Sequence, residues 1–104
     1  GFMKIYIAGK ITGNPDYKAQ FAGAEAALRA KGHSVMNPAH IGECGAEFTY
    51  RNYMSVARAM QSVCDAVYFL PNWKDSNGAR QEHKHARATW QRMYFKLEDV
   101  EAAQ

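Results

Sequence analysis

A carboxylate on the inward face of a helix is the residue of this sequence with the clearest capacity for chemistry. Glu82 lies one turn after Gly78, and helical periodicity places it with Ala79 and Ala86, two small residues that let a helix lie close to a sheet. A buried carboxylate is costly unless it has a partner or a function. The alternative to a functional role is an ion pair with a basic neighbour, namely Arg80, Lys84 or Arg58.

The segment AGKITG is a candidate ligand-binding loop at the end of the first predicted strand. Gly9 and Gly13 allow the backbone to turn sharply and to approach a ligand closely. Thr12 adds a hydroxyl and Lys10 adds a positive charge. A helix that begins near Asn14 would present free N–H groups to an anion. The segment matches neither a Walker loop nor the GxGxxG fingerprint, so a plain strand–helix turn is the alternative.

The segment PNWKDSNGARQEHKHA follows the third predicted strand and carries more signal. One of the residues Asp75, Ser76 and Asn77 is expected to cap the helix that starts near Gly78. Trp73 could stack on a nucleobase, or it could anchor the loop in a partly buried position. This loop is therefore a second candidate binding loop, and its helix carries the carboxylate described above.

Metal and thiol chemistry are not expected. His83 and His85 are two residues apart on a predicted helix, so they point roughly 200° apart and cannot share an ion. His33 and His40 add no recognised ligand spacing, and neither cysteine has a neighbouring histidine in sequence. We expect no metal and no cofactor.

Strand and helix signals alternate along the chain. Short alternating or apolar runs predict four strands, at residues 3–8, 33–37, 65–70 and 93–97. Apolar residues at helical spacing predict three helices, at about 14–32, 50–63 and 78–91. Asn14 is expected to cap the first helix with Pro15 at its first position, and Trp90 to lie on or near the buried face of the third. Residues 39–48 show no clear period and predict a loop.

This β-α-β-α-β-α-β order predicts an α/β fold, a three-layer flavodoxin- or Rossmann-like sandwich around a parallel sheet of four or five strands. Right-handed crossovers favour the strand order 2-1-3-4. That order has a topological switch point between the first and third strands, and ligands bind outside the carboxyl ends of the strands at such points. Both candidate loops fall there.

Composition bounds the remaining possibilities. A length of 104 residues predicts a single domain over residues 1–104, and apolar residues make up 47% of the chain. The formal net charge is +3 and no Lys/Arg run exceeds two residues, so we expect no nucleic-acid partner. Apolar runs are too short for a membrane span, and two cysteines favour a reducing cytoplasm. Gly1 and Phe2 precede Met3 and are expected to be left over from protein expression.

The motifs together resemble the nucleoside 2-deoxyribosyltransferase-like superfamily. The matching segments are KIYIAGKITG, GHSVMNP and CDAVYFLPNWKDSNGARQEHKHA, within a resemblance that covers residues 3–97. The short, uncharacterised branch that is common in phage and prophage genomes is the most similar. Better-known members break or transfer the N-glycosidic bond of deoxynucleosides or their 5′-monophosphates.

The resemblance implies roles for particular residues. Glu82 would be the nucleophile that attacks the anomeric carbon, leaving an oxocarbenium-like sugar that the carboxylate traps. The two loops would hold the sugar and phosphate through Gly9, Thr12, Gly13, Ser76 and Gly78. Relatives complete their pockets with a neighbouring subunit. A homodimer or larger homo-oligomer is therefore expected, and one predicted helix carries surplus apolar residues for it: Tyr50, Tyr53, Met54 and Met60.

Two positions depart from the pattern of the superfamily. Relatives usually have proline where this chain has Lys10, which could bind a phosphate or point to solvent. Catalytic relatives also carry an aspartate that protonates the departing base or orients the sugar, and its expected place falls at or beside Ala57 and Arg58. Arginine stays charged and cannot donate a proton usefully, but it can pair with Glu82 or a phosphate.

Three hypotheses therefore stand. The chain is an N-glycosidase or deoxyribosyltransferase, a catalytically weak or silent protein that senses or sequesters a nucleotide-derived signal, or a structural protein with the same fold.

Overall fold

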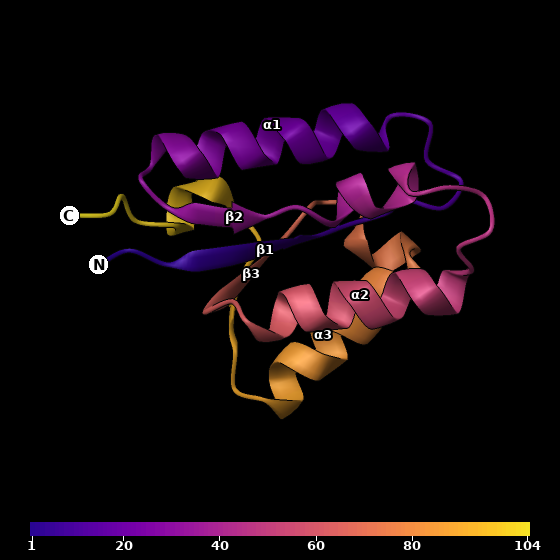
Figure 1. The fold of residues 1–104 in the computed structure, drawn as a ribbon. Helices are drawn as coiled ribbons and strands as arrows, with labels where there is room; N and C mark the ends of the chain where they lie inside the picture. Colours follow the sequence, from indigo (N-terminus) through magenta and orange to yellow (C-terminus); the bar gives the residue numbers. More distant parts are fainter.

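Four strands pair in parallel in the computed structural model, which describes residues 1–42 and 44–104 (Figure 1). The strand order is β2-β1-β3-β4. The strands are β1 (Lys4–Ala8), β2 (Ser34–Met36), β3 (Ala66–Phe69) and β4 (Arg92–Tyr94). In the centre of the sheet, Ile5 lies opposite Val35 on one side and Ala66 on the other. The predicted fold class and strand order are confirmed.

Helices cover both faces of this sheet. They are α1 (Tyr17–Ala30), α2 (Tyr50–Ser62) and α3 (Asn77–Ala88). Figure 1 shows α1 on one side and α2 and α3 together on the other, which makes three layers. The helices lie on opposite faces because successive right-handed crossovers change direction at the switch point between β1 and β3.

The buried core has two halves, one on each face of the sheet. Strand β1 shows why: Ile5 and Ile7 point toward α1, whereas Tyr6 and Ala8 point toward α2 and α3. All four side chains are fully buried, as is usual for a central parallel strand. The α1 half also contains Phe21, Leu28 and Val100, and the α2–α3 half contains Ala57, Val67, Phe69, Ala79 and Ala86.

The predicted cap of the first helix is wrong. Helix α1 begins at Tyr17, and Asp16 stands at the N-cap with no side-chain hydrogen bond. The Asn14 side chain is used earlier: its Oδ1 accepts from the Asp16 N–H at 3.1 Å, and its Nδ2 donates to the Lys10 carbonyl at 2.8 Å. Asn14 therefore closes an Asx turn, with Pro15 inside that turn, and the helix starts after it.

The segment between β2 and α2 is more regular than the sequence predicts. Part of the expected loop at 39–48 is a 3₁₀ helix (Pro38–Glu43), which Asn37 caps by accepting from the Ala39 N–H at 2.9 Å. The capping box of Thr49 and Asn52 then begins α2.

The end of α3 differs from the prediction. Trp90 is 95% exposed and has a φ of 60°, so it does not lie on the buried face of α3. The left-handed backbone there reverses the chain into β4 and turns the indole into solvent. Strand β4 pairs with β3 over only three residues and ends at Tyr94, and Leu97–Asp99 form a 3₁₀ helix rather than the end of a strand.

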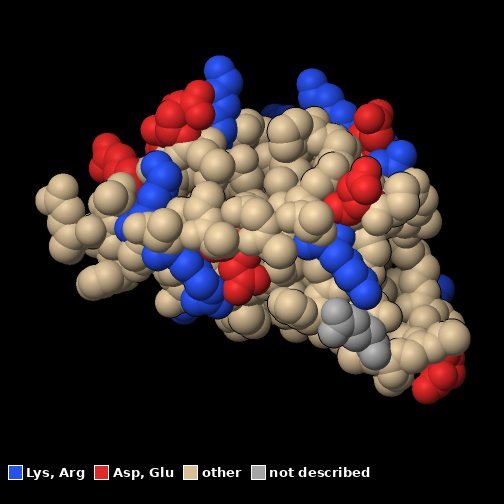
Figure 2. All heavy atoms as spheres, turned by 90° about the horizontal axis from the view of Figure 1, so that it is seen from above, with Lys and Arg blue, Asp and Glu red and all other residues tan. Residues whose placement is uncertain are grey.

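Charged side chains of both signs share the surface. Figure 2 looks onto the face covered by α1, where lysine and arginine are interspersed with aspartate and glutamate. No helix in the described part of the chain is both long and apolar enough to cross a bilayer.

Candidate active site

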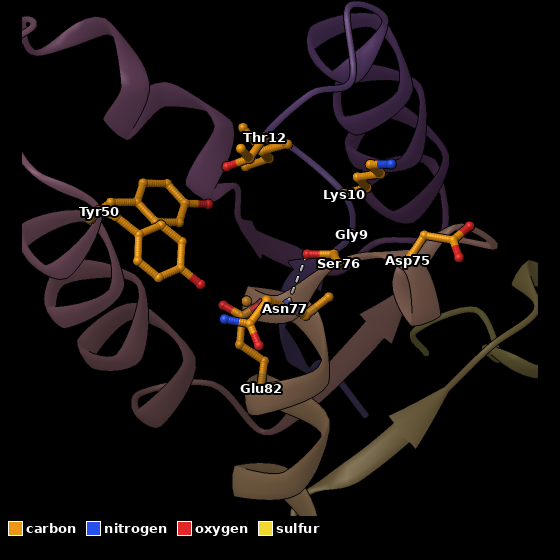
Figure 3. Close-up of a pocket in the computed structure, with 12 residues that line it drawn as sticks. Gly9, Lys10, Thr12, Tyr50, Asp75, Ser76, Asn77 and Glu82 are labelled. Atoms are coloured by element: carbon orange, nitrogen blue, oxygen red, sulfur yellow. Dashed lines mark hydrogen bonds between the residues drawn. The ribbon is translucent and has the colours of Figure 1, made fainter.

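A cavity of about 400 Å³ opens at the carboxyl ends of β1 and β3, where the loops after both strands meet the start of α3 (Figure 3). Figure 3 shows Tyr50 on one side of this space and Lys10 and Asp75 on the other. We call it the main cavity. It is lined by Gly9, Lys10, Ile11, Thr12, Tyr50, Tyr53, Asp75, Ser76, Asn77, Gly78, Ala79 and Glu82.

The start of α3 forms one wall of the main cavity. Ser76 caps this helix by accepting from the Ala79 N–H at 3.0 Å, as one of the three predicted capping residues. A Cβ added to Gly78 would lie 3.3 Å from the Tyr50 hydroxyl, so the missing side chain lets α2 and α3 approach closely here. The first turn of α3 brings partial positive charge to the cavity.

Glu82 lies deeper, one turn further along α3, and only 4% of its surface is exposed. The buried Tyr6 hydroxyl donates a hydrogen bond to Oε2 of Glu82. Gln61 of α2 donates from Nε2 to the backbone carbonyl of Glu82 at 2.9 Å, which holds this turn of the helix. No basic side chain in the described residues lies within ion-pair distance of the Glu82 carboxylate, so the ion-pair interpretation of Glu82 is not supported.

Burial sets the acidity of this pair. Loss of hydration raises the pKa of Glu82 to about 7, and the Tyr6 hydrogen bond and the positive charge of Arg58 only partly oppose it. Burial, together with the negative charge of Glu82, raises the pKa of Tyr6 well above 10. Tyr6 therefore stays a neutral donor, while Glu82 changes between acid and carboxylate near neutral pH.

A second cavity of about 290 Å³ adjoins the first on the side of α2. The two cavities share Ile11, Thr12, Tyr50 and Tyr53. We call it the side cavity, and its other lining residues are Ile41, Gly42, Gly45, Phe48 and Thr49. Side chains of Ile41, Phe48 and the two tyrosines make its walls suitable for a flat, partly apolar group.

The structure brings together most of the residues that the sequence singled out. Those that line the main cavity are Gly9, Lys10, Thr12, Asp75, Ser76, Gly78 and Glu82. Gly13 does not line the cavity; it lies in the turn between β1 and α1, with a φ of 73°. Trp73 instead stacks on His83 with ring centroids 4.5 Å apart, which fits the loop-anchor interpretation. Arg58 lies outside the lining, with a buried Nε that has no hydrogen-bond partner among the described residues.

The position expected for a second acid faces the core. Ala57 is fully buried among Tyr6, Val67 and Phe69, so a side chain at this position of α2 points into an apolar layer. Asp65, another acid close to this position in the sequence, lies at the opposite end of the sheet, where it accepts from the Lys4 N–H at 2.8 Å. Asp75 lines the main cavity and is the remaining carboxylate there.

Sequence analysis missed the part played by Tyr6. It is fully buried in the central strand, and its hydroxyl meets a side chain 76 positions away in the sequence. The available signal was weak: a tyrosine in a central strand whose neighbours are aliphatic, on the same face as the helix that carries Glu82. Tyr53 was interpreted only as apolar surface, and it lines both cavities.

We expect Gly9→Ala to disturb the cavity by displacing the loop after β1. The added Cβ would lie 2.6 Å from Leu70 Cδ1, and Leu70 is itself buried, so strain of about 1–3 kcal/mol is expected in the free energy of unfolding. Gly23→Ala is the matched control, since nothing lies within 4 Å of its Cβ in α1, and it should stabilise the protein slightly. Urea denaturation measures both, and equal effects would show that space at Gly9 is not limiting.

Comparison with known proteins agrees with this geometry. Residues 3–95 match the family described as a domain of unknown function, DUF4406. The chain belongs to this family. A solved structure of 2-deoxyribosyltransferase from the psychrotolerant bacterium Bacillus psychrosaccharolyticus, described as a biocatalyst for nucleoside synthesis, superposes with a TM-score of 0.74. The alignment covers 97% of this chain and 92% of that one at 20% sequence identity, which establishes a shared fold. No curated protein matches this member of the DUF4406 family.

Proposed function

We propose that this DUF4406 protein binds a nucleoside or nucleoside 5′-monophosphate and cleaves or transfers its N-glycosidic bond through Glu82. The observation that carries the proposal is a buried carboxylate, held by a buried phenol, that borders a cavity at the switch point of the sheet. Such a site is where open α/β sheets bind ligands. The shared fold with a 2-deoxyribosyltransferase supports the same chemistry.

The reaction suits a single deeply placed carboxylate. Glu82 attacks the anomeric carbon as the bond to the base breaks, and a glycosyl ester forms on Glu82. Water or a second base then releases the sugar and restores the carboxylate. Because the nucleophile must be ionised, the environment that brings the pKa of Glu82 to about 7 leaves a large fraction active at neutral pH.

The loops around the cavity supply groups for the sugar and phosphate. Thr12 and Ser76 offer hydroxyls, and Gly9 and Gly78 let the backbone approach a ligand. Lys10 adds a positive charge at the side of the cavity away from Tyr50 (Figure 3). We assign the sugar to the space beside Glu82 and a 5′-phosphate, where present, to the Lys10 side.

A second candidate function is a nucleotide-binding protein with weak or no turnover. The specific observation in its favour is that the place expected for a base-protonating acid, at or beside Ala57 and Arg58, holds a buried alanine and an arginine outside the cavity lining. General acid catalysis of that kind contributes typically 10²–10⁴-fold in rate. The homo-oligomer expected from the resemblance stays a prediction. Of the four residues of α2 that were expected to supply its apolar surface, Tyr50 is exposed, whereas Tyr53, Met54 and Met60 are half-buried.

Wild-type protein is expected to bind deoxynucleoside monophosphates readily and to release their bases slowly. A ligand at 100 times its dissociation constant raises the free energy of unfolding by about 2.7 kcal/mol, so thermal shift detects binding directly. Base release from a panel of nucleosides and monophosphates, followed by chromatography, measures turnover. We expect rates below the ordinary enzymatic range of about 1–10³ per second. Absence of base release with every member of the panel would refute cleavage by Glu82, and absence of a thermal shift as well would refute binding.

A further inference from the structure

We propose that the Tyr53 hydroxyl is the proton donor to the departing base, with the base held in the side cavity and the sugar in the main cavity. This inference rests on the proposed function and deepens it. It assigns a catalytic role to a residue of α2 that lies one turn before the buried Ala57.

The arrangement of the two cavities carries the first step. Glu82 lines the main cavity but not the side cavity, whereas Tyr53 lines both. A nucleoside whose anomeric carbon lies beside Glu82 must extend its base away from that carboxylate, because the nucleophile and the leaving group occupy opposite faces of the anomeric carbon. The adjoining space is the side cavity, with Ile41, Phe48 and Tyr50 as its wide apolar surfaces. The glycosidic bond then crosses the boundary where Tyr53 lies.

The Tyr53 hydroxyl is free to act on a ligand. Within residues 1–42 and 44–104 its hydroxyl forms no hydrogen bond, in contrast to Tyr6, which donates to Glu82. The hydroxyl oxygen is not fully buried, and Tyr53 lines both cavities, so a ligand there can reach it. The phenol of Tyr53 is half-buried, keeps its proton and has no acceptor among the described residues, so it can donate that proton to a bound ligand.

The charge of Glu82 acts on the Tyr53 phenol across the main cavity, which both residues line. The pKa of Tyr53 is raised first by burial and then by the negative charge of Glu82, so the phenol is neutral when substrate binds. When Glu82 forms the glycosyl ester its negative charge disappears, and the phenol becomes easier to ionise at the moment when the base needs a proton. This is the timing that a general acid requires.

Every proton and electron pair in the step is accounted for. The pair of the C–N bond moves to the base nitrogen, a Glu82 lone pair forms the C–O bond, and the Tyr53 proton moves to the base. Water then attacks the anomeric carbon, its oxygen stays on the sugar, its proton returns to the Tyr53 phenolate, and Glu82 leaves as a carboxylate. The sum is hydrolysis, and a second base with an N–H takes the place of water in transfer.

Two substrates that differ in their need for a proton test this assignment. A deoxyadenosine-type nucleoside needs protonation of its base, whereas a nucleoside with a cationic pyridinium-type base loses it as a neutral molecule. Tyr53→Phe should lower kcat on the first by about 10²–10⁴-fold and leave kcat on the second within a few-fold of wild type. Tyr94→Phe is the control, because among the described residues its hydroxyl has one hydrogen-bond partner, the Met3 sulfur at 3.9 Å, away from both cavities.

The outcomes separate this inference from the proposed function. If wild type releases both bases and Glu82→Gln abolishes release, but Tyr53→Phe slows both substrates equally or neither, then Tyr53 is not the proton donor and the proposed function stands. If wild type releases neither base, the proposed function fails and the assignment of Tyr53 fails with it. Selective loss on the adenine substrate alone supports both.

Discussion

Glu82→Gln is expected to abolish base release and, above pH 7, to make the protein more stable than wild type. Glutamine keeps the shape of the side chain and can still accept from the Tyr6 hydroxyl, but its amide cannot form a glycosyl ester. The gain in stability arises because a buried carboxylate must ionise in the folded state at high pH. Base release measured beside urea denaturation tests both effects on one variant.

The sign of the stability change follows from proton linkage. The pKa of Glu82 is about 7 in the folded protein, above its ordinary value of 4.5, so the folded state binds the proton more tightly than the unfolded state. Wild-type stability therefore falls as pH rises from about 4.5 to 7. Each pKa unit is worth about 1.4 kcal/mol, so Glu82→Gln should exceed wild type by up to about 3 kcal/mol at pH 8. At pH 4, where the carboxyl group is protonated in both states, the difference should disappear.

Glu25→Gln is the matched control, with the opposite sign expected. Hydrogen bonds from Asn37 at 2.9 Å and from Arg29 at 2.9 Å lower the pKa of Glu25. Its contribution to stability is therefore present above pH 4.5 and is lost as pH falls through the folded-state pKa. Glu25→Gln should lower the free energy of unfolding at pH 8 and leave base release unchanged. A Glu82→Gln variant with the pH dependence of wild type would mean that the pKa of Glu82 is the same in the folded and unfolded states.

The fold could be predicted from the sequence because its signals are local and repeated. Apolar strands bounded by glycine or proline alternate with helical stripes, and right-handed crossovers in a doubly wound sheet favour the order 2-1-3-4. The wrong predictions concern turns at the ends of helices, where a single residue decides the conformation. Asn14 can cap a helix or close an Asx turn, and the sequence does not say which. Trp90 fits a helical stripe, yet a left-handed residue at that position ends the helix.

The loop residues of the candidate site could be predicted from the sequence. The contact between a strand side chain and a helix side chain could not. Lys10 and Ser76 follow strands whose carboxyl ends must meet, so topology alone brings them together. Tyr6 reaches Glu82 only because β1 turns that residue toward α3, and the apolar pattern of β1 is equally satisfied by a tyrosine that packs without a partner. Periodicity identifies the face of a strand but not the contact that a hydroxyl makes on it.

Tyr6→Phe is expected to move the pH dependence of base release upward. The phenol is the one side chain in the described residues that donates to the Glu82 carboxylate, and this hydrogen bond lowers a pKa that burial raises. A hydrogen bond to a charged group is worth about 1.5–3 kcal/mol, which corresponds to roughly one to two pKa units. Activity at pH 7 should therefore fall about 10–100-fold and recover near pH 9, because the nucleophile must be ionised.

Tyr68→Phe provides the comparison that isolates this effect. Tyr68 is a buried tyrosine of the adjacent strand β3, but it packs on the α1 side of the sheet, away from Glu82. Loss of its hydroxyl should leave the pH profile in place, even where the free energy of unfolding falls in both variants. A Tyr6→Phe profile that superposes on wild type, or that loses activity equally at every pH, would contradict control of Glu82 ionisation by Tyr6. A shift to higher pH with recovery of the rate requires that the phenol stabilises the carboxylate from which the reaction starts.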